Sequence, residues 1–117
     1  EIEVFDPLRI EINYEIFDNK IDDILIGVAI FDAERKYIFG PNTFLDNFSI
    51  KSSKGKHLIT YQIPKMPLTA GTYFLDVGIF TDKGIVNLDY HQSIDSFKVF
   101  SDYITEGSVY IEHNWKQ

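Results

Sequence analysis

The sequence predicts an all-β fold, a sandwich or a barrel, on three observations. Short runs of residues alternate between apolar and polar, which is the period of a strand with one buried face. Turn-forming residues separate these runs at regular intervals. The composition is rich in Tyr (7) and Phe (10) and poor in Met and Trp, a bias that suits a pleated, half-buried surface. No segment shows a helical period over a useful length.

The first half of the chain contains three predicted strands. Residues 8–16 alternate cleanly and predict a strand with one face in water, and a polar break follows at residues 18–20. Residues 24–31 are more fully apolar, and residues 37–39 begin a short strand after a polar turn. Residues 40–43 have loop composition. Residues 44–50 are compatible with a short helix or an irregular crossing.

The second half contains the longest alternating runs. Two strands, residues 56–63 and 73–80, flank a linker that holds Pro64, Pro67 and the turn signal at residues 70–71. A hairpin turn at residues 82–84 leads to three further predicted strands, at residues 85–90, 94–100 and 108–115. Phe97 and Val99 are expected to point inward, and Trp115, the sole tryptophan, is expected to fill a core position.

Length and charge narrow the class of protein. A chain of 117 residues can bury one core, so we expect a single domain over residues 1–117, and its start at Glu1 suggests a fragment of a longer protein. The net charge of −7, without a Lys/Arg cluster, argues against nucleic acid and against an anionic membrane surface. No apolar run is long enough to span a bilayer, so direct membrane insertion is not expected.

Catalytic and metal chemistry find little support in the sequence. The three histidines lie in separate segments without ligand spacing, and there is no cysteine. The acidic residues Asp18, Asp22 and Asp23 match no calcium loop and are better explained as solvated turn residues. No nucleophile elbow or phosphate-binding glycine loop is present. We therefore expect no enzyme activity, no metal and no cofactor.

A binding face is easier to identify. If residues 73–80 form a strand with Tyr73, Leu75, Val77 and Ile79 inward, the other face combines two aromatic rings, a carboxylate and a glycine. Apolar platforms with a few placed polar groups are what sugars and other small polar ligands require. With residues 24–31 in the same sheet, Gly27 and Ala29 would leave a shallow trough beside Gly78. The candidate carbohydrate-binding residues around it are Phe74, Asp76, Phe80, Phe31, Tyr90 and His91.

The same face could instead pack against a partner subunit or another segment of chain. Exposure of Phe74, Asp76 and Phe80 would favour ligand binding, whereas their burial by a second copy would favour an interaction module. A carbohydrate-binding module of a secreted enzyme is a third possibility.

Several motifs together resemble a known family, the C-terminal polysaccharide-binding domain of Wzt-type ATPases from O-antigen ABC transporters. The resemblance runs from about Leu8 to Trp115. It rests on four stretches in order: Ile30-Phe31-Asp32 followed by Tyr37-Ile-Phe-Gly-Pro-Asn-Thr43, then Leu68-Thr-Ala-Gly-Thr-Tyr73 after Ile63-Pro64, then Phe97-Lys-Val99, and finally Gly107-Ser-Val-Tyr-Ile-Glu-His-Asn-Trp115. Pro41 departs from the small polar residue expected at its position.

This resemblance implies an immunoglobulin-like antiparallel β-sandwich without enzyme activity, joined in the parent protein to a cytoplasmic ATPase domain. It implies that the domain recognises finished O-antigen polysaccharide, often by its non-reducing end, so that only completed chains are exported. It also implies a homodimer, in some members with strand exchange, and attachment to the membrane subunit of the transporter through the ATPase domain. Because the binding residues vary with the glycan among family members, the resemblance implies which sheet face binds but not which residues do so.

Overall fold

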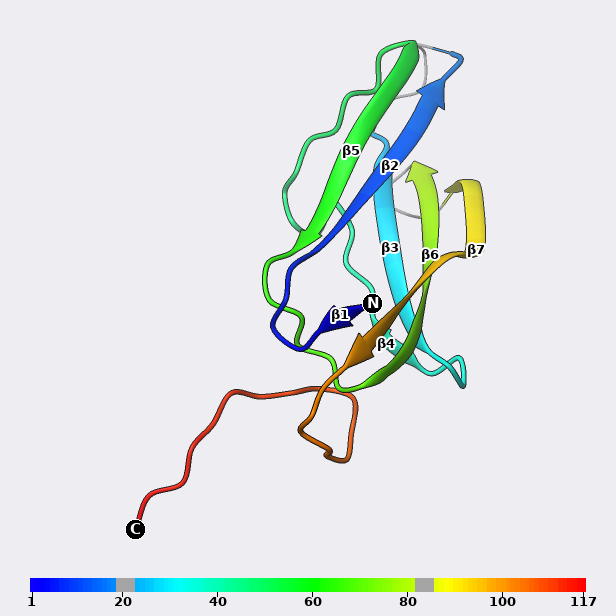
Figure 1. Cartoon of the computed structure of the whole chain (residues 1–117). Coiled ribbons are helices and arrows are strands. Elements are labelled where there is room, and N and C mark those ends of the chain that lie inside the picture. The colour runs from blue at the N-terminus through cyan, green and yellow to red at the C-terminus, as the bar shows by residue number, and fades with distance from the viewer. Residues whose placement is uncertain (19–22, 82–85) are drawn as a thin grey trace.

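The computed structural model describes residues 1–18, 23–81 and 86–117, and the regular elements of this part of the chain are strands (Figure 1). The strands are β1 (Ile2–Glu3), β2 (Leu8–Ile16), β3 (Leu25–Asp32), β4 (Tyr37–Phe39), β5 (Gly55–Ile63), β6 (Gly71–Thr81) and β7 (Val86–Phe100). The all-β prediction is confirmed. Five predicted strands correspond to β2, β3, β4, β5 and β6, and each begins and ends within two residues of the observed strand. No helix long and apolar enough to cross a membrane occurs in the described ranges.

The strands form two sheets that face each other. Five strands in the order β1-β7-β6-β3-β4 make a curled sheet, and β2 pairs with β5 in a two-stranded sheet across from it (Figure 1). This arrangement is sandwich-like. The expectation of a wholly antiparallel sheet was wrong, because β1 runs parallel to the end of β7, where Ile2 pairs with Val99. The immunoglobulin-like topology stays a prediction.

The core lies between the two sheets and follows from the alternation of the strands. One group of buried side chains comes from β3, β6, β7 and the linker after β5: Val28, Ile30, Met66, Leu68, Tyr73, Leu75 and Val99. A second group lies toward the other end of the same space: Tyr14, Ile16, Ile24, Ile26 and Val77. The inward positions predicted for Phe97 and Val99 are confirmed, since Val99 is buried and Phe97 packs against the first group.

Two elements of the C-terminal third differ from the prediction. Residues 86–90 and 94–100 of the two predicted strands belong to one long strand, β7, because the residues between them form a bulge against β6 instead of a turn, and residue 85 lies outside the described residues. Residues 108–115 are not a strand, and only Val109 forms an isolated bridge, with Leu68. Trp115 does not fill the core: it is 91% exposed, on a segment that extends away from the sheets (Figure 1).

The remaining loops are described in part. Residues 44–50 contain no helix, and the loop before them runs along the free edge of β3, where the Val28 N–H donates to Pro41 and the Thr43 N–H donates to Ile26. The hairpin turn predicted at residues 82–84, most of the break predicted at residues 18–20, and Asp22 of the acidic loop lie outside the described residues.

Candidate functional site

The outer face of the five-stranded sheet gathers most of the predicted binding residues. In the antiparallel pair of β3 and β6, Gly27 lies opposite Gly78, Ala29 opposite Asp76, and Phe31 opposite Phe74. Directly opposed residues project on the same side of a sheet. Ile26, Val28 and Ile30 and the β6 residues opposite them point into the core. The side chains of the residues between them therefore project from the outer face of the sheet.

Two further predicted residues join this face and one does not. Phe80 lies opposite Leu25 on β3, and Tyr90 lies opposite Gly78 on β7. His91 is paired with Val77, whose side chain points into the core, so His91 lies on the opposite side of the sheet. The prediction that His91 borders the same trough was therefore wrong, because adjacent residues of a strand point to opposite faces.

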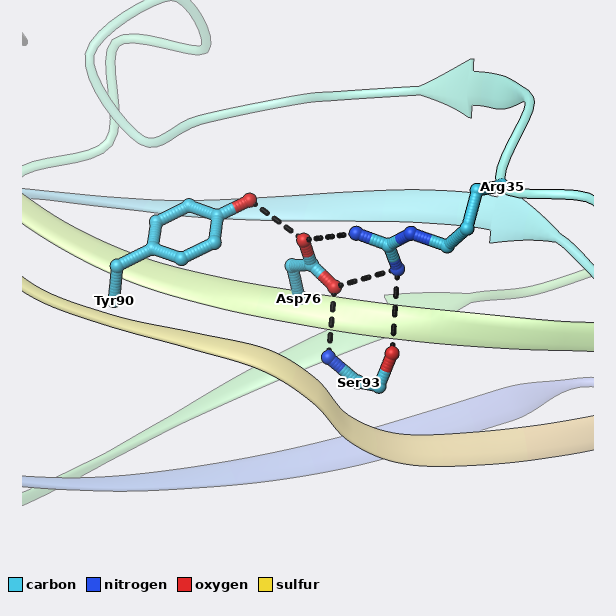
Figure 2. Close-up of polar contacts among 4 residues, drawn as sticks. All are labelled: Arg35, Asp76, Tyr90 and Ser93. Carbon is cyan, nitrogen blue, oxygen red and sulfur yellow. Dashed lines mark hydrogen bonds and ion pairs between the residues drawn. The ribbon is translucent and has the colours of Figure 1, made fainter.

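Asp76 is not exposed as the ligand-binding hypothesis assumed, but is 1% exposed and fully hydrogen-bonded. Arg35 donates to both carboxylate oxygens, from Nη1 to Oδ1 at 3.2 Å and from Nη2 to Oδ2 at 3.1 Å. The Ser93 N–H donates to Oδ1 at 2.8 Å and the Tyr90 hydroxyl to Oδ2 at 2.7 Å (Figure 2). Each oxygen thus accepts two hydrogen bonds. We call Arg35, Asp76, Tyr90 and Ser93 the Asp76 cluster.

Two unusual backbone conformations build the Asp76 cluster. Ser93 (φ 47°) and Arg35 (φ 63°) both adopt the left-handed region, which costs a residue other than glycine about 1–2 kcal/mol. Ser93 lies in the bulge of β7 that faces Asp76, between the register pairs Leu75 with Asp95 and Val77 with His91. Bulges re-aim groups at functional sites, and here the backbone N–H of Ser93 is directed at the carboxylate.

Arg35 is placed by the tight turn between β3 and β4. Asp32 Oδ1 accepts hydrogen bonds from the N–H groups of Glu34 and Lys36, and the Asp32 carbonyl accepts one from the Arg35 N–H. An aspartate that folds its own turn in this way is common at such positions. The strained φ of Arg35 is compensated by the paired hydrogen bonds of its guanidinium with Asp76. Strain of this kind, held by surrounding contacts, is concentrated at functional sites.

The electrostatics of the cluster keep Asp76 ionised and Tyr90 neutral. Burial acts to raise the pKa of Asp76, but the hydrogen bonds from Arg35, Ser93 and Tyr90 outweigh it, so the pKa lies below its ordinary value. Burial, and then the hydrogen bond to the Asp76 carboxylate, raise the pKa of Tyr90 to about 12. The hydrogen bond to Asp76 also raises the pKa of Arg35.

This gives a prediction for alkaline pH. The contact of Tyr90 with Asp76 needs the hydroxyl proton, so its contribution to stability is complete below the unfolded-state pKa of about 10 and is lost as pH rises through about 12. In absorbance titrations of tyrosine ionisation, the difference between the wild type and Tyr90→Phe should have its midpoint near 12. A midpoint near the ordinary value of about 10 would contradict the hydrogen bond.

Beside the Asp76 cluster lies an aromatic platform formed by Phe31 and Tyr37. The two rings are stacked with centroids 5.1 Å apart, and the guanidinium carbon of Arg35 lies 3.9 Å from the centroid of the Phe31 ring. Tyr37 is 61% exposed and the Arg35 side chain 41%. The outer face therefore presents an open aromatic ring next to a fixed, partly exposed guanidinium.

The trough expected beside Gly78 is filled by the protein's own rings. A Cβ atom at Gly78 would lie 2.6 Å from the Phe80 ring and 2.8 Å from the Tyr90 ring, so both rings lie directly on this glycine. The prediction of an open groove here was wrong, because the missing side chain is replaced by neighbouring aromatics. A Cβ atom added at Gly27 would lie 3.6 Å or more from the nearest atoms of other residues, which is an ordinary van der Waals distance.

The two facing glycines make a matched pair for mutation. Gly78→Ala is expected to displace Phe80 and Tyr90 and to lower the free energy of unfolding by about 1–3 kcal/mol, the usual cost of overpacking. Gly27→Ala, directly opposite in the sheet, should cost less than about 1 kcal/mol. Chemical denaturation of both variants checks this. Equal costs would show that the rings above Gly78 move aside freely.

Sequence reasoning missed three residues of this face: Arg35, Tyr37 and Ser93. Arg35 and Ser93 were assigned to a polar turn and to a gap between two strands, where neither apolar period nor motif singles out a residue. Tyr37 was placed correctly in a short strand but not in the site. No group of three or more potential metal ligands occurs in the described part of the chain.

Comparison with known proteins matches the whole domain to one family. A family model described as the Wzt C-terminal domain matches residues 1–111. Among solved structures, the chain is similar to one described as the crystal structure of the C-terminal domain of wzt, with a TM-score of 0.82 and 15% sequence identity over 99% of this chain and 72% of that one. At this identity the structural match shows a shared fold. Comparison with curated protein sequences found no match.

Proposed function

The chain belongs to the Wzt C-terminal domain family, and from this premise we propose that the outer face of its five-stranded sheet binds O-antigen polysaccharide for export by an ABC transporter. The domain would act without catalysis, as one carbohydrate-binding unit over residues 1–117. It would select finished chains through their non-reducing terminal region. Its place would be the cytoplasmic side of the transporter, where an ATPase domain of the parent protein connects it to the membrane subunit.

The observation that supports this proposal is the pairing of the aromatic platform with the Asp76 cluster. Sugars stack their apolar C–H faces on aromatic rings and use their hydroxyls for a few directed hydrogen bonds. Tyr37 offers an exposed ring, and Arg35 offers donors whose orientation is fixed by Asp76. Phe31, Phe74, Phe80 and Tyr90 complete the face. Asp76 itself would position Arg35 and Tyr90 instead of contacting the glycan.

The mechanism would be differential binding of one chain end over others. One stacked ring and one or two hydrogen bonds contribute roughly 1 kcal/mol each, which corresponds to millimolar to micromolar affinity at best. Weak binding allows the domain to release its cargo. Two faces in a dimer could raise the avidity without new contacts.

Titration of the 117-residue chain with the polysaccharide of its own source strain, followed by NMR shifts, tests the proposal. We expect saturable shifts in the wild type that are lost in Tyr37→Ala. Phe39→Ala is the matched control, because Phe39 is also an exposed aromatic of β4 but is paired with Ile30 and lies toward the core side of the sheet. Shifts that survive in Tyr37→Ala would move the site to another face. An absence of shifts in the wild type would contradict glycan binding.

A second function, homodimerisation, is favoured by the C-terminal segment. Its residues from 101 onward expose large apolar side chains: Tyr103, Ile104, Val109, Ile111 and Trp115. Exposed apolar groups gathered in one segment mark an interaction surface. We propose that a second copy of this chain covers the segment, which leaves the outer sheet face free for the glycan.

A further inference from the structure

We infer that the sugar unit bound by the outer face is uncharged and is held by two adjacent oxygens on the free edge of the Arg35 guanidinium. The inference rests on the proposed glycan binding and adds the chemical class of the bound unit. It follows from three features of the Asp76 cluster: which donors are still free, how the charge is balanced, and where the aromatic ring lies.

The free donors of Arg35 can be counted. A guanidinium carries five N–H donors in a fixed plane. Nη1 uses both of its donors, toward Asp76 Oδ1 at 3.2 Å and Ser93 Oγ at 3.2 Å, and Nη2 uses one, toward Asp76 Oδ2 at 3.1 Å. Among the described residues, Nε–H and the second Nη2–H have no partner. These two donors lie on the same edge of the guanidinium, so they form a fork for two neighbouring acceptor atoms.

The charge balance of the cluster disfavours an anion at this fork. The bidentate pair with Asp76 neutralises Arg35, and the low pKa of Asp76 keeps its carboxylate ionised near neutral pH. A second carboxylate or a phosphate on the other edge would gain no net positive charge and would be repelled by Asp76. The net charge of the whole chain is −7, which also disfavours an anionic ligand. Two hydroxyl or ether oxygens of a neutral sugar meet the same donors without this repulsion.

The acceptor side of the cluster leads to the same conclusion. Both oxygens of Asp76 already accept two hydrogen bonds each, so the carboxylate has no lone pair left to accept a hydrogen bond from a sugar hydroxyl. The ligand must therefore supply acceptors and not donors at this point. The exposed ring of Tyr37 stacks on Phe31, the same ring over which Arg35 lies, so the fork and an exposed aromatic ring belong to one continuous part of the outer face.

Binding of the source-strain polysaccharide to the 117-residue chain, measured by NMR titration at about 20 mM and 500 mM NaCl, tests the inference. Salt screens contacts between charges and affects neutral hydrogen bonds little. We expect the Kd of the wild type to change less than twofold between the two salt concentrations. Arg35→Lys, which keeps the charge and loses the fork, should weaken binding at least tenfold.

The control variant is Lys36→Gln, which removes the neighbouring positive charge in the same turn and leaves the fork intact. It should bind as the wild type does. A Kd that rises fivefold or more with salt, or binding retained by Arg35→Lys, would overturn the inference and leave the proposed glycan binding in place. A wild type that shows no saturable shifts would overturn the proposed function, and the inference with it. Thermal unfolding of both variants confirms that they are folded.

Discussion

Asp76→Ala is expected to destabilise the domain and to abolish glycan binding together. The substitution removes a buried acceptor of four hydrogen bonds and leaves the Ser93 N–H, the Tyr90 hydroxyl and the Arg35 guanidinium without their shared partner. The loss of these charge-assisted hydrogen bonds to a buried carboxylate should lower the free energy of unfolding by about 2–3 kcal/mol, after allowance for the partial exposure of Arg35. Denaturant unfolding measures this cost, and the NMR titration measures the loss of binding.

The matched control is another carboxylate–arginine pair of the same protein. Glu11 lies 3.4 Å from Arg9 on β2, and both side chains are exposed. Exposed pairs contribute little, so Glu11→Ala should change the free energy of unfolding by less than about 0.5 kcal/mol and leave glycan binding unchanged. Similar costs for the two variants would show that burial of Asp76 does not matter.

Acid provides an independent check on the same carboxylate. Because the pKa of Asp76 is lower in the folded protein, its contribution to stability is present above the unfolded-state pKa of about 4 and is lost as pH falls through the folded value. The stability difference between the wild type and Asp76→Ala should therefore shrink as the pH is lowered below about 4. A difference that is constant with pH would mean that the ionised carboxylate is not the stabilising group.

The strands could be predicted because their alternation is a local property of the sequence. Residues 8–16 show this best, since the predicted strand and β2 have the same bounds. The faces of β3 and β6 also follow, because placing the two apolar faces inward puts Gly27, Phe31, Phe74 and Gly78 on the same outward side. The faces of the sheet, and with them five of the six candidate residues, were accessible from pattern alone.

The chemistry of the site could not be predicted, because it depends on backbone shapes that the pattern does not encode. An aspartate on an outward position of a strand is ordinarily solvated. Asp76 is buried only because the turn at Arg35 and the bulge at Ser93 both bring donors over it from segments 41 and 17 residues away. The same bulge explains why one long strand looked like two, since it interrupts the alternation of β7 without ending it.

The C-terminal segment was mispredicted for a different reason. Val109 and Ile111 alternate as in a strand, but among the described residues the backbone hydrogen bonds from this segment to the body of the domain end at Tyr110, and beyond it the His113 ring lies near the Tyr110 ring. The Thr69 N–H donates to Ser108 at 3.0 Å, the Tyr110 N–H donates to Pro67, and the Tyr110 ring packs on Phe5. Ile111 and Trp115 stay 73% and 91% exposed in this copy, so their side chains are open to an intermolecular contact.

If the proposed dimer forms through this segment, truncation after Tyr110 is expected to convert it to a monomer without unfolding the domain. The removed residues 111–117 include Ile111 and Trp115, which are 73% and 91% exposed and bury little in their own copy. The retained contacts of Ser108 and Tyr110 should keep the thermal unfolding temperature of the monomer unit nearly unchanged. Light scattering at increasing protein concentration measures the mass of the wild type and the truncated chain.

The glycan titration of the same truncated chain separates the two proposed roles. If the segment serves assembly alone, each monomer should keep the intrinsic affinity of its outer face and lose only the avidity for a polysaccharide that reaches two faces. A truncated chain that remains dimeric would place the interface elsewhere, and the exposed edges of β2 and β4 would be the next surfaces to test. A monomeric wild type at high concentration would argue against the dimer. In that case, selection of the polysaccharide would depend on the single face built around Arg35 and Tyr37.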